Sequence, residues 1–158
     1  MPQTRADLFK IFFTALCVAV ICIWTVFVSG CGYAKHKDPE LFYESSPRAA
    51  AEAARLHARE IGGSYHQNIC CGSMQPLIFK GDYIVVEPSP YNDDLLGQAV
   101  VYLPQWNAGN LVLHRLVSGN AADGFIASGD NNPHSEAFER VTAANYRARV
   151  VAIYRPIQ

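Results

Sequence analysis

The sequence predicts a mainly β protein whose core is a small, coiled antiparallel sheet or barrel. Three observations lead to this prediction. Five short runs of β-branched and apolar residues are separated by turn-forming residues, an uncharged apolar run lies near the N-terminus, and one alanine-rich run has the composition of a helix. A chain of 158 residues is long enough for one domain with a modest core.

The apolar run near the N-terminus covers residues 11–29 and contains no charged residue. A helix of this length can cross the hydrocarbon core of a bilayer. The flanking charges do not assign an orientation, because positive residues stand on both sides, at Arg5, Lys10, Lys35 and Lys37.

The residues that end this run support a second interpretation. The sequence VSGC, which ends at Cys31, resembles the lipobox at which bacterial lipoproteins are cleaved and lipidated. Residues 1–31 are therefore either kept as a membrane anchor or removed with lipidation of Cys31, and the length of the run favours the anchor. In both cases membrane lipid is an expected partner, and residues 32–158 are expected on the extracytoplasmic side, periplasmic or extracellular.

Residues 32–62 are expected to form a linker and a short surface helix. The linker covers 32–45, which is polar with interspersed aromatic residues. Ser46 is suited to the N-cap of a helix and Pro47 to its first position. The following run, RAAAEAARLHAREI, has high helix propensity and ends at Gly62.

Residues 63–158 carry the strand pattern of the β domain. The turn sequences PSPYNDD, PQWNAGN, SGNAADG and GDNNPHS separate the apolar runs. Strands are expected at 83–87, 99–103, 110–117, 124–128 and 148–154. Short strands with few helices are typical of a coiled antiparallel sheet or small barrel.

Charge and cysteine content exclude two classes of function. The net charge is −1 at pH 7, so the sequence predicts no nucleic-acid partner. The cysteines show no CxxC spacing, and adjacent cysteines rarely bridge each other without strain, so neither a zinc site nor a disulfide framework is expected. They are Cys17, Cys22, Cys31, Cys70 and Cys71. No metal and no cofactor is predicted.

Ser73, in the stretch CCGSMQPLIFKGD, and His114, in LVLHRLV, are the candidate nucleophile and base. A serine hydroxyl needs a neighbouring base to take its proton, and a histidine side chain titrates near neutral pH. Alternation in the strand puts His114 on one face with Val112 and Leu116, which partly desolvates and holds the ring. Taken singly, a serine after glycine or an aspartate such as Asp130 is more often a turn residue, so the assignment depends on the joint pattern.

The joint pattern consists of four elements in order: SMQPLIFKGDYIVV, GQAVVY, LHRLV and ASGDNN. This series resembles the type I signal peptidase family of serine endopeptidases, whose boxes read S-M-x-P, four residues, G-D, and later G-D-N. The residues that match the first box are Ser73, Met74, Pro76, Gly81 and Asp82. Bacterial members commonly use lysine as base, whereas His114-Arg115 is similar to the Ser/His branch of archaea, the endoplasmic reticulum and some Gram-positive bacteria. The resemblance covers about residues 70–155.

The resemblance implies a membrane-tethered serine endopeptidase that cleaves after small residues in exported preproteins, for signal-peptide removal or a specialised relative of it. Ser73 would attack the scissile carbonyl, and His114 would take its proton and later deliver one to the leaving amine. Asp130 would orient His114 or support the site in the manner of a triad. Glu136 is the alternative acid.

Four further residues acquire roles from the resemblance. Met74 would contact the substrate or pack beneath it, and Pro76 would fix the bend. Backbone N–H groups around Ser73 would form an oxyanion hole, and Gly72 would allow close approach. Cys71 stands where bacterial members often have a serine donor, and a thiol donates weakly. Ser73, not Cys71, is in register with the nucleophile of the motif.

The expected partner is a preprotein or pilin-like peptide that binds by strand addition, and no oligomeric state is predicted. Two other classes of protein remain open. One is a self-cleaving regulator related to the SOS repressor, which shares this sheet and a serine nucleophile but uses lysine as base. The other is a catalytically inactive membrane-tethered or lipoprotein binding module, to which Gln98 points because the family usually has aspartate there.

Overall fold

The computed structural model describes residues 37–68, 72–105, 109–132 and 136–157. The chain divides into two compact units, residues 1–33 and residues 34–158, and the described residues belong to the second. The apolar run 11–29 and Cys31 lie outside the described residues. Within those residues, no helix has the length and apolar character needed to span a membrane.

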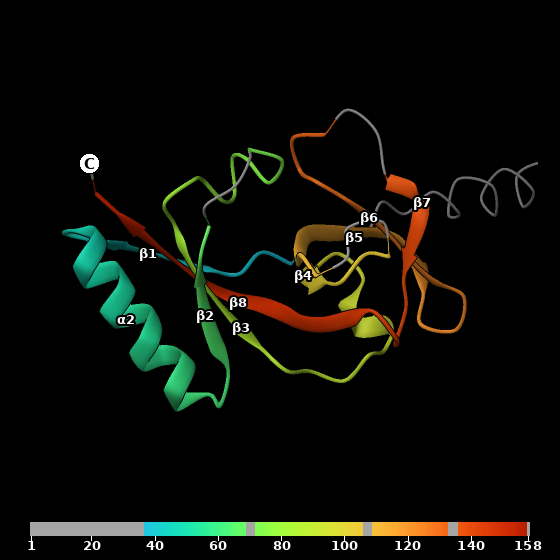
Figure 1. The fold of residues 1–158 in the computed structure, drawn as a ribbon, viewed down its shortest axis with the longest axis horizontal. Coiled ribbons are helices and arrows are strands. Elements are labelled where there is room, and N and C mark those ends of the chain that lie inside the picture. Colours follow the sequence, from blue (N-terminus) through green and yellow to red (C-terminus); the bar gives the residue numbers. More distant parts are fainter. Residues whose placement is uncertain (1–36, 69–71, 106–108, 133–135, 158) are drawn as a thin grey trace, which may run out of the picture. The chain divides into compact units, whose positions relative to one another are not determined.

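The described residues form one curled sheet with a helix beside it (Figure 1). The elements, in chain order, are β1 (Glu40–Glu44), α2 (Pro47–Glu60), β2 (Ser64–Gln67), β3 (Tyr83–Glu87), the 3-10 helix η1 (Asp93–Leu95), β4 (Ala99–Tyr102), β5 (Val112–Asn120), β6 (Gly124–Ser128), β7 (Glu136–Val141) and β8 (Tyr146–Pro156). The prediction of a mainly β domain with a coiled antiparallel sheet is confirmed.

The sheet has the strand order β2-β3-β8-β4-β5-β6-β7, and all neighbours along this path are antiparallel. The long strand β8 pairs with β3 on one edge, and with β4 and then the parallel strand β1 on the other. The pairing register shifts in four of the strand pairs. Such bulges increase local twist and bend the strands, which explains why the sheet curls.

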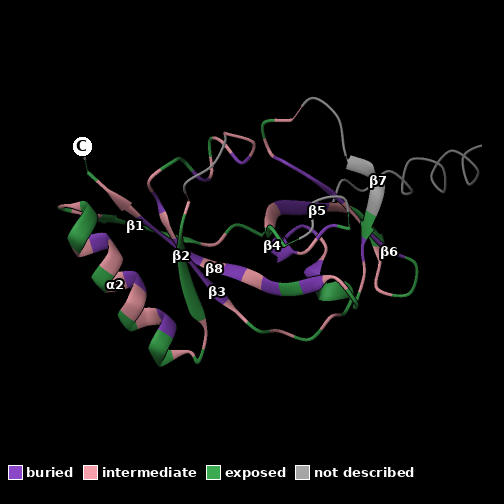
Figure 2. Cartoon of the chain, in the orientation of Figure 1, coloured by how far each residue is buried: buried purple, intermediate pink, exposed green. Residues whose placement is uncertain are grey.

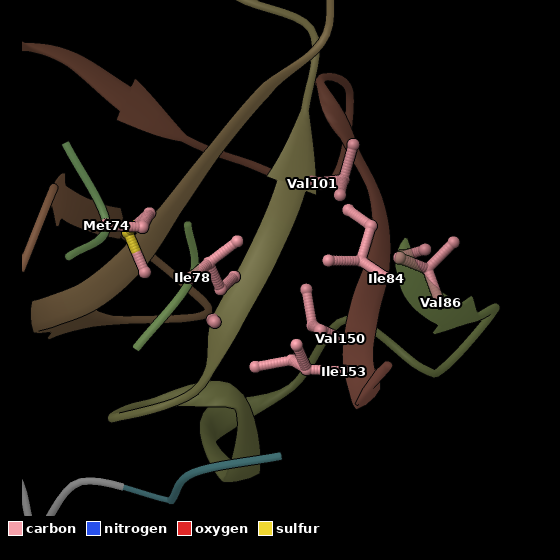
Figure 3. Packing of buried hydrophobic residues seen from close by; sticks show 9 residues of the cluster. Met74, Ile78, Ile84, Val86, Val101, Val150 and Ile153 are labelled. Atoms are coloured by element: carbon pink, nitrogen blue, oxygen red, sulfur yellow. The ribbon is translucent and has the colours of Figure 1, made fainter. Parts of the chain in front are cut away.

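Two apolar clusters pack against the sheet, on opposite faces of β4. One cluster joins β3, β4 and β8 to the loop that precedes β3, from which Met74 and Ile78 insert their side chains (Figure 3). The other lies among β4 to β8 and includes Leu116 and Phe125, neither of which is exposed. The loop that carries Ser73 is therefore part of the core packing and not an appendage of the sheet.

Helix α2 begins where the sequence predicts. The Ser46 side chain accepts a hydrogen bond from the N–H of Ala49, and proline occupies the first position. Ala50, Ala54 and Ala58 recur every four residues and are buried, so they share one side of the helix. Figure 2 shows buried positions along α2. Because alanine is small, this face packs closely on β3 and β8, while the opposite face stays in solvent.

The five predicted strands are present as β3, β4, β5, β6 and β8; β3 and β6 have the predicted bounds, and the others differ by one to three residues at an end. Three further strands have no clear sequence signal. Strand β1 lies in the stretch 32–45 that was expected to be a linker, β2 is polar and exposed throughout, and β7 begins just after a turn sequence. Short strands of this kind form because a neighbouring strand offers backbone partners, and not because their own residues alternate.

Candidate functional site

The structure brings Ser73 and His114 together. Ser73 lies in the loop between β2 and β3, and His114 lies in β5 with only 6% of its surface exposed. The His114 Nε2 atom is 3.3 Å from the Ser73 Oγ atom, which is within reach for a hydrogen bond. Proton transfer from Ser73 requires the tautomer in which Nε2 is unprotonated. Nucleophile–base distances are often long before substrate binds.

The residues after Ser73 anchor its loop in the core. Met74 is 4% exposed and Ile78 is 1% exposed, and the N–H of Ile78 donates to the Met74 carbonyl at 2.9 Å. The N–H of Gln75 donates to the Gly72 carbonyl. The Met74 side chain packs in the core cluster with Ile78. Pro76 is exposed and follows a cis peptide bond.

A buried ion pair closes the other end of the loop. The Asp82 carboxylate is 2% exposed and accepts hydrogen bonds from the Phe79 N–H at 2.8 Å and from Arg155 Nη2 at 2.6 Å. Arg155 also donates to the Leu77 carbonyl and stacks over the Phe79 ring. Its hydrogen bond with Asp82 is the main cause that raises the pKa of Arg155. The G-D of the first box thus binds the loop to β8.

The turn after β6 supports Ser73 from the other side. The Asn131 N–H donates to the Ser73 carbonyl at 2.7 Å, and the Asn131 side-chain amide donates to the Gly72 carbonyl at 3.1 Å. Gly129 lies so close that a Cβ atom added to it would be 2.5 Å from the Ser73 carbonyl oxygen and 2.9 Å from the Ser73 Cβ. Glycine is therefore required at this position by the approach of the two backbones.

Asp130, the residue between these two contacts, binds Arg115. Its two carboxylate oxygens accept from Arg115 Nε and Nη2, both at 2.8 Å, in the bidentate geometry favoured by guanidinium groups. Arg115 follows His114 in β5, so the two side chains leave opposite faces of the strand. The Asp130 carboxylate therefore binds Arg115, and this ion pair holds the turn whose residues contact Ser73.

Arg115 is itself buried, with 1% of its surface exposed. Burial alone would lower the pKa of this guanidinium, but the hydrogen bonds and charges of Asp130 and Asp38 outweigh burial and raise it. Arg115 also donates from Nη1 to the Gly97 carbonyl at 2.8 Å and from Nη2 to Asp38 at 2.7 Å. The group stays charged and holds four acceptor atoms from separate parts of the chain.

The structure describes the remaining predicted site residues only in part. Gly72 is half-buried, and a Cβ atom added to it would meet the Gln75 amide group at about 3.0 Å. Cys71 lies outside the described residues. Glu136 opens β7, where its backbone pairs with Ala127, and its side chain is outside the described part of the structure. In the described ranges, no group of three or more acidic, histidine or cysteine side chains could hold a metal ion.

Sequence reasoning missed Arg115, Asn131 and Asp38. A signal for Arg115 was present, because an arginine inside an apolar strand requires a buried acidic partner. Asn131 belongs to the GDNN sequence but has no distinctive local pattern. Asp38 gave no signal, since its partner lies 77 positions further along the chain.

No family model, curated protein or solved structure matches the chain. The residues themselves define a chemical type of site. A serine hydroxyl faces an imidazole nitrogen, and main-chain hydrogen bonds and a buried ion pair hold the serine in place. This is the arrangement required for nucleophilic catalysis by serine with histidine as general base.

Proposed function

We propose that the protein is a membrane-tethered serine endopeptidase with Ser73 as nucleophile and His114 as general base. The observation that carries the proposal is the 3.3 Å approach of His114 Nε2 to Ser73 Oγ, between residues 41 positions apart. The ordered series of motifs that resembles type I signal peptidases names the same two residues independently of the geometry.

The reaction proceeds by acyl transfer. Ser73 Oγ attacks the scissile carbonyl carbon while its proton passes to His114 Nε2, and backbone N–H groups around Ser73 stabilise the oxyanion. His114 then gives this proton to the leaving amine, and the peptide C–N bond breaks. A water molecule, deprotonated by the same nitrogen, hydrolyses the Ser73 ester and restores the free serine.

The substrate class is an extended peptide with small side chains before the scissile bond, such as an exported preprotein or a pilin-like precursor. Strand β2 supports this, because it ends the sheet order and all four of its residues are exposed. Within the described residues, one edge of β2 pairs with no strand, and a peptide could add along that edge. A membrane tether would raise the effective concentration of cleavage sites near the bilayer.

Cleavage of a preprotein with an A-x-A site tests the proposal, with the full chain in detergent or liposomes. We expect cleavage by the wild type, its loss in Ser73→Ala and in His114→Ala, and its retention in Cys71→Ser. Circular dichroism of each variant checks that the fold is kept. Full activity of Ser73→Ala would contradict the proposal. A wild type that cleaves none of several preproteins or pilin precursors would favour the inactive binding module.

A further inference from the structure

A short arm, residues 37–38, packs against the segment that joins η1 to β4. The Lys37 N–H donates to the Gly97 carbonyl at 3.1 Å, and its ammonium group donates to the Asp94 carbonyl at 2.8 Å. Lys37 also forms a parallel bridge with Gln98, just before β4. The arm therefore occupies a defined place, although the stretch that contains it was expected to be a linker.

The position of the arm brings the Asp38 side chain to the buried guanidinium of Arg115. Its Oδ1 atom lies 2.7 Å from Arg115 Nη2, the same nitrogen that donates to Asp130. The Gly97 carbonyl accepts both from Arg115 Nη1 and from the Lys37 N–H, so the arm and the guanidinium share an acceptor. Three groups therefore hold the Arg115 guanidinium: the Asp130 carboxylate, the Gly97 carbonyl and the Asp38 carboxylate of the arm.

Asp130 connects this cluster to Ser73, because both of its immediate neighbours in the β6–β7 turn contact Ser73. Asp130 is held by Arg115, and its neighbours Gly129 and Asn131 touch the Ser73 backbone. A shift of the guanidinium therefore moves the turn, and the turn moves Ser73 relative to His114. Small displacements of a nucleophile have large kinetic effects, because attack requires a narrow range of distance and angle.

We propose that Asp38 is a positioning residue of the catalytic centre, so that the chain just after the predicted anchor completes the active site. This inference rests on the proposed peptidase function. The Asp38 side chain is 55% exposed, whereas that of Arg115 is 2% exposed. Solvent screens an ion pair of this kind, and its contribution to folding stability is small. The role of Asp38 is therefore to orient Arg115, and the expected loss is in kcat.

The test measures kcat and KM of the full chain on a preprotein substrate for Asp38→Ala, Asp38→Asn and Asp38→Glu. We expect Asp38→Ala to lower kcat about 10-fold with KM within about twofold of the wild type, and without a matching loss of stability. Asp38→Asn keeps a hydrogen-bond acceptor, so its kcat should lie between those of Asp38→Ala and the wild type. Asp38→Glu should recover part of the rate. Glu40→Ala is the matched control, since it removes an exposed acid from the adjoining β1 and should keep the wild-type rate.

A second measurement separates this inference from the proposed function. The Asn131 N–H donates to Ser73, so its hydrogen exchange reports the turn without requiring catalysis. We expect exchange of this amide to be about 10-fold faster in Asp38→Ala and unchanged in Glu40→Ala. If the wild type cleaves no substrate, the proposed function is wrong. In that case the exchange rate of the Asn131 amide still tests whether Asp38 holds the turn in place. Unchanged exchange, or an unchanged kcat in an active enzyme, would overturn the inference.

Discussion

The His114 Nε2 atom lies 3.3 Å from the Ser73 Oγ atom, with Ser73 on a core-anchored loop and His114 in the middle of the sheet. The Ser73 loop is held by the core packing of Met74 and Ile78 and by the turn after β6, and His114 is held by the pairing of β5 with β4 and β6. Because the Ser73 loop and strand β5 set the distance between these two atoms, a few substitutions should be enough to change the reactivity of the pair.

Replacement of the base is the most direct of these substitutions. We expect His114→Gln to lower kcat by about 10²–10⁴, because the amide cannot take the Ser73 proton, while KM changes little. His57→Gln is the control, since His57 contacts Tyr154 beside α2 and should leave the rate of peptide cleavage unchanged. Equal rates for His114→Gln and the wild type would mean that another group removes the proton.

Gly129→Ala should impair both catalysis and stability. The added methyl group would press on the Ser73 carbonyl and Cβ, at 2.5 Å and 2.9 Å before relaxation. We expect kcat to fall about 10–100-fold and the free energy of unfolding to fall by about 1–3 kcal/mol.

Gly62→Ala provides the comparison for this variant. Gly62 has φ +68° after α2, and no atom lies within 4 Å of an added Cβ. The strain of that substitution should cost about 1 kcal/mol of stability with no loss of kcat. If both glycine variants lost kcat equally, contact with Ser73 would not be the cause.

The Arg115–Asp130 pair should show strong energetic coupling. Asp130→Leu leaves a buried guanidinium without its bidentate partner, and we expect a loss of about 3 kcal/mol in the free energy of unfolding. The double variant Arg115→Met/Asp130→Leu should lose less than the sum of the single losses, with a coupling energy of about 2 kcal/mol. Urea unfolding measures all four free energies. Additive losses would show that the pair contributes no interaction energy.

The Asp82–Arg155 pair is expected to hold the Ser73 loop through its distal end. Asp82→Asn weakens the bonds from Arg155 and from the Phe79 N–H, and we expect a loss of about 2–4 kcal/mol. Arg149→Met is a suitable control, because Arg149 pairs with Glu87 nearer the surface and should cost less than about 1 kcal/mol. A smaller loss for Asp82→Asn than for Arg149→Met would contradict this account.

Stability should fall at alkaline pH because of buried tyrosines. Burial is the main cause that raises the pKa of Tyr91, Tyr146 and Tyr154. A raised pKa means that the folded state favours the neutral phenol. This contribution is complete below about pH 10 and is lost as the pH rises through the folded-state pKa values.

Ultraviolet absorbance titration and unfolding measurements check this prediction. We expect Tyr91, Tyr146 and Tyr154 to ionise above the ordinary range of a tyrosine, and their ionisation to coincide with unfolding. Tyr146→Phe should weaken the alkaline fall in stability, whereas Tyr65→Phe, on the exposed strand β2, should not. If all tyrosines ionised together while the chain stayed folded, buried tyrosines would not be the cause of an alkaline loss of stability.

Local composition was sufficient to predict much of the sheet. Strands β3, β4, β5, β6 and β8 are rich in β-branched residues and lie between turn sequences, and α2 has a serine cap and a proline start. These signals act over a few residues, so they can be read from the chain without knowledge of its partners. Strands β1, β2 and β7 have no such signal, because strands elsewhere in the chain stabilise them.

The candidate chemistry was also visible in the residues. Ser73, His114 and Asp130 stand in a recognisable order, and the side chain of each restricts the role that it can play. The partner of Asp130 was not visible. It depends on β5 and β6 lying side by side, with a register that puts Arg115 opposite Ser128 and so brings it to the following turn.

Residue chemistry and backbone propensity are properties of short stretches, and for this protein they specified a β domain with a serine and a histidine able to react. Ion pairs and packing contacts depend on distances between segments that are far apart in the chain. The curl of the sheet set those distances: it brought Ser73 to His114, placed Gly129 against Ser73, and gave Arg115 the carboxylates of both Asp130 and Asp38.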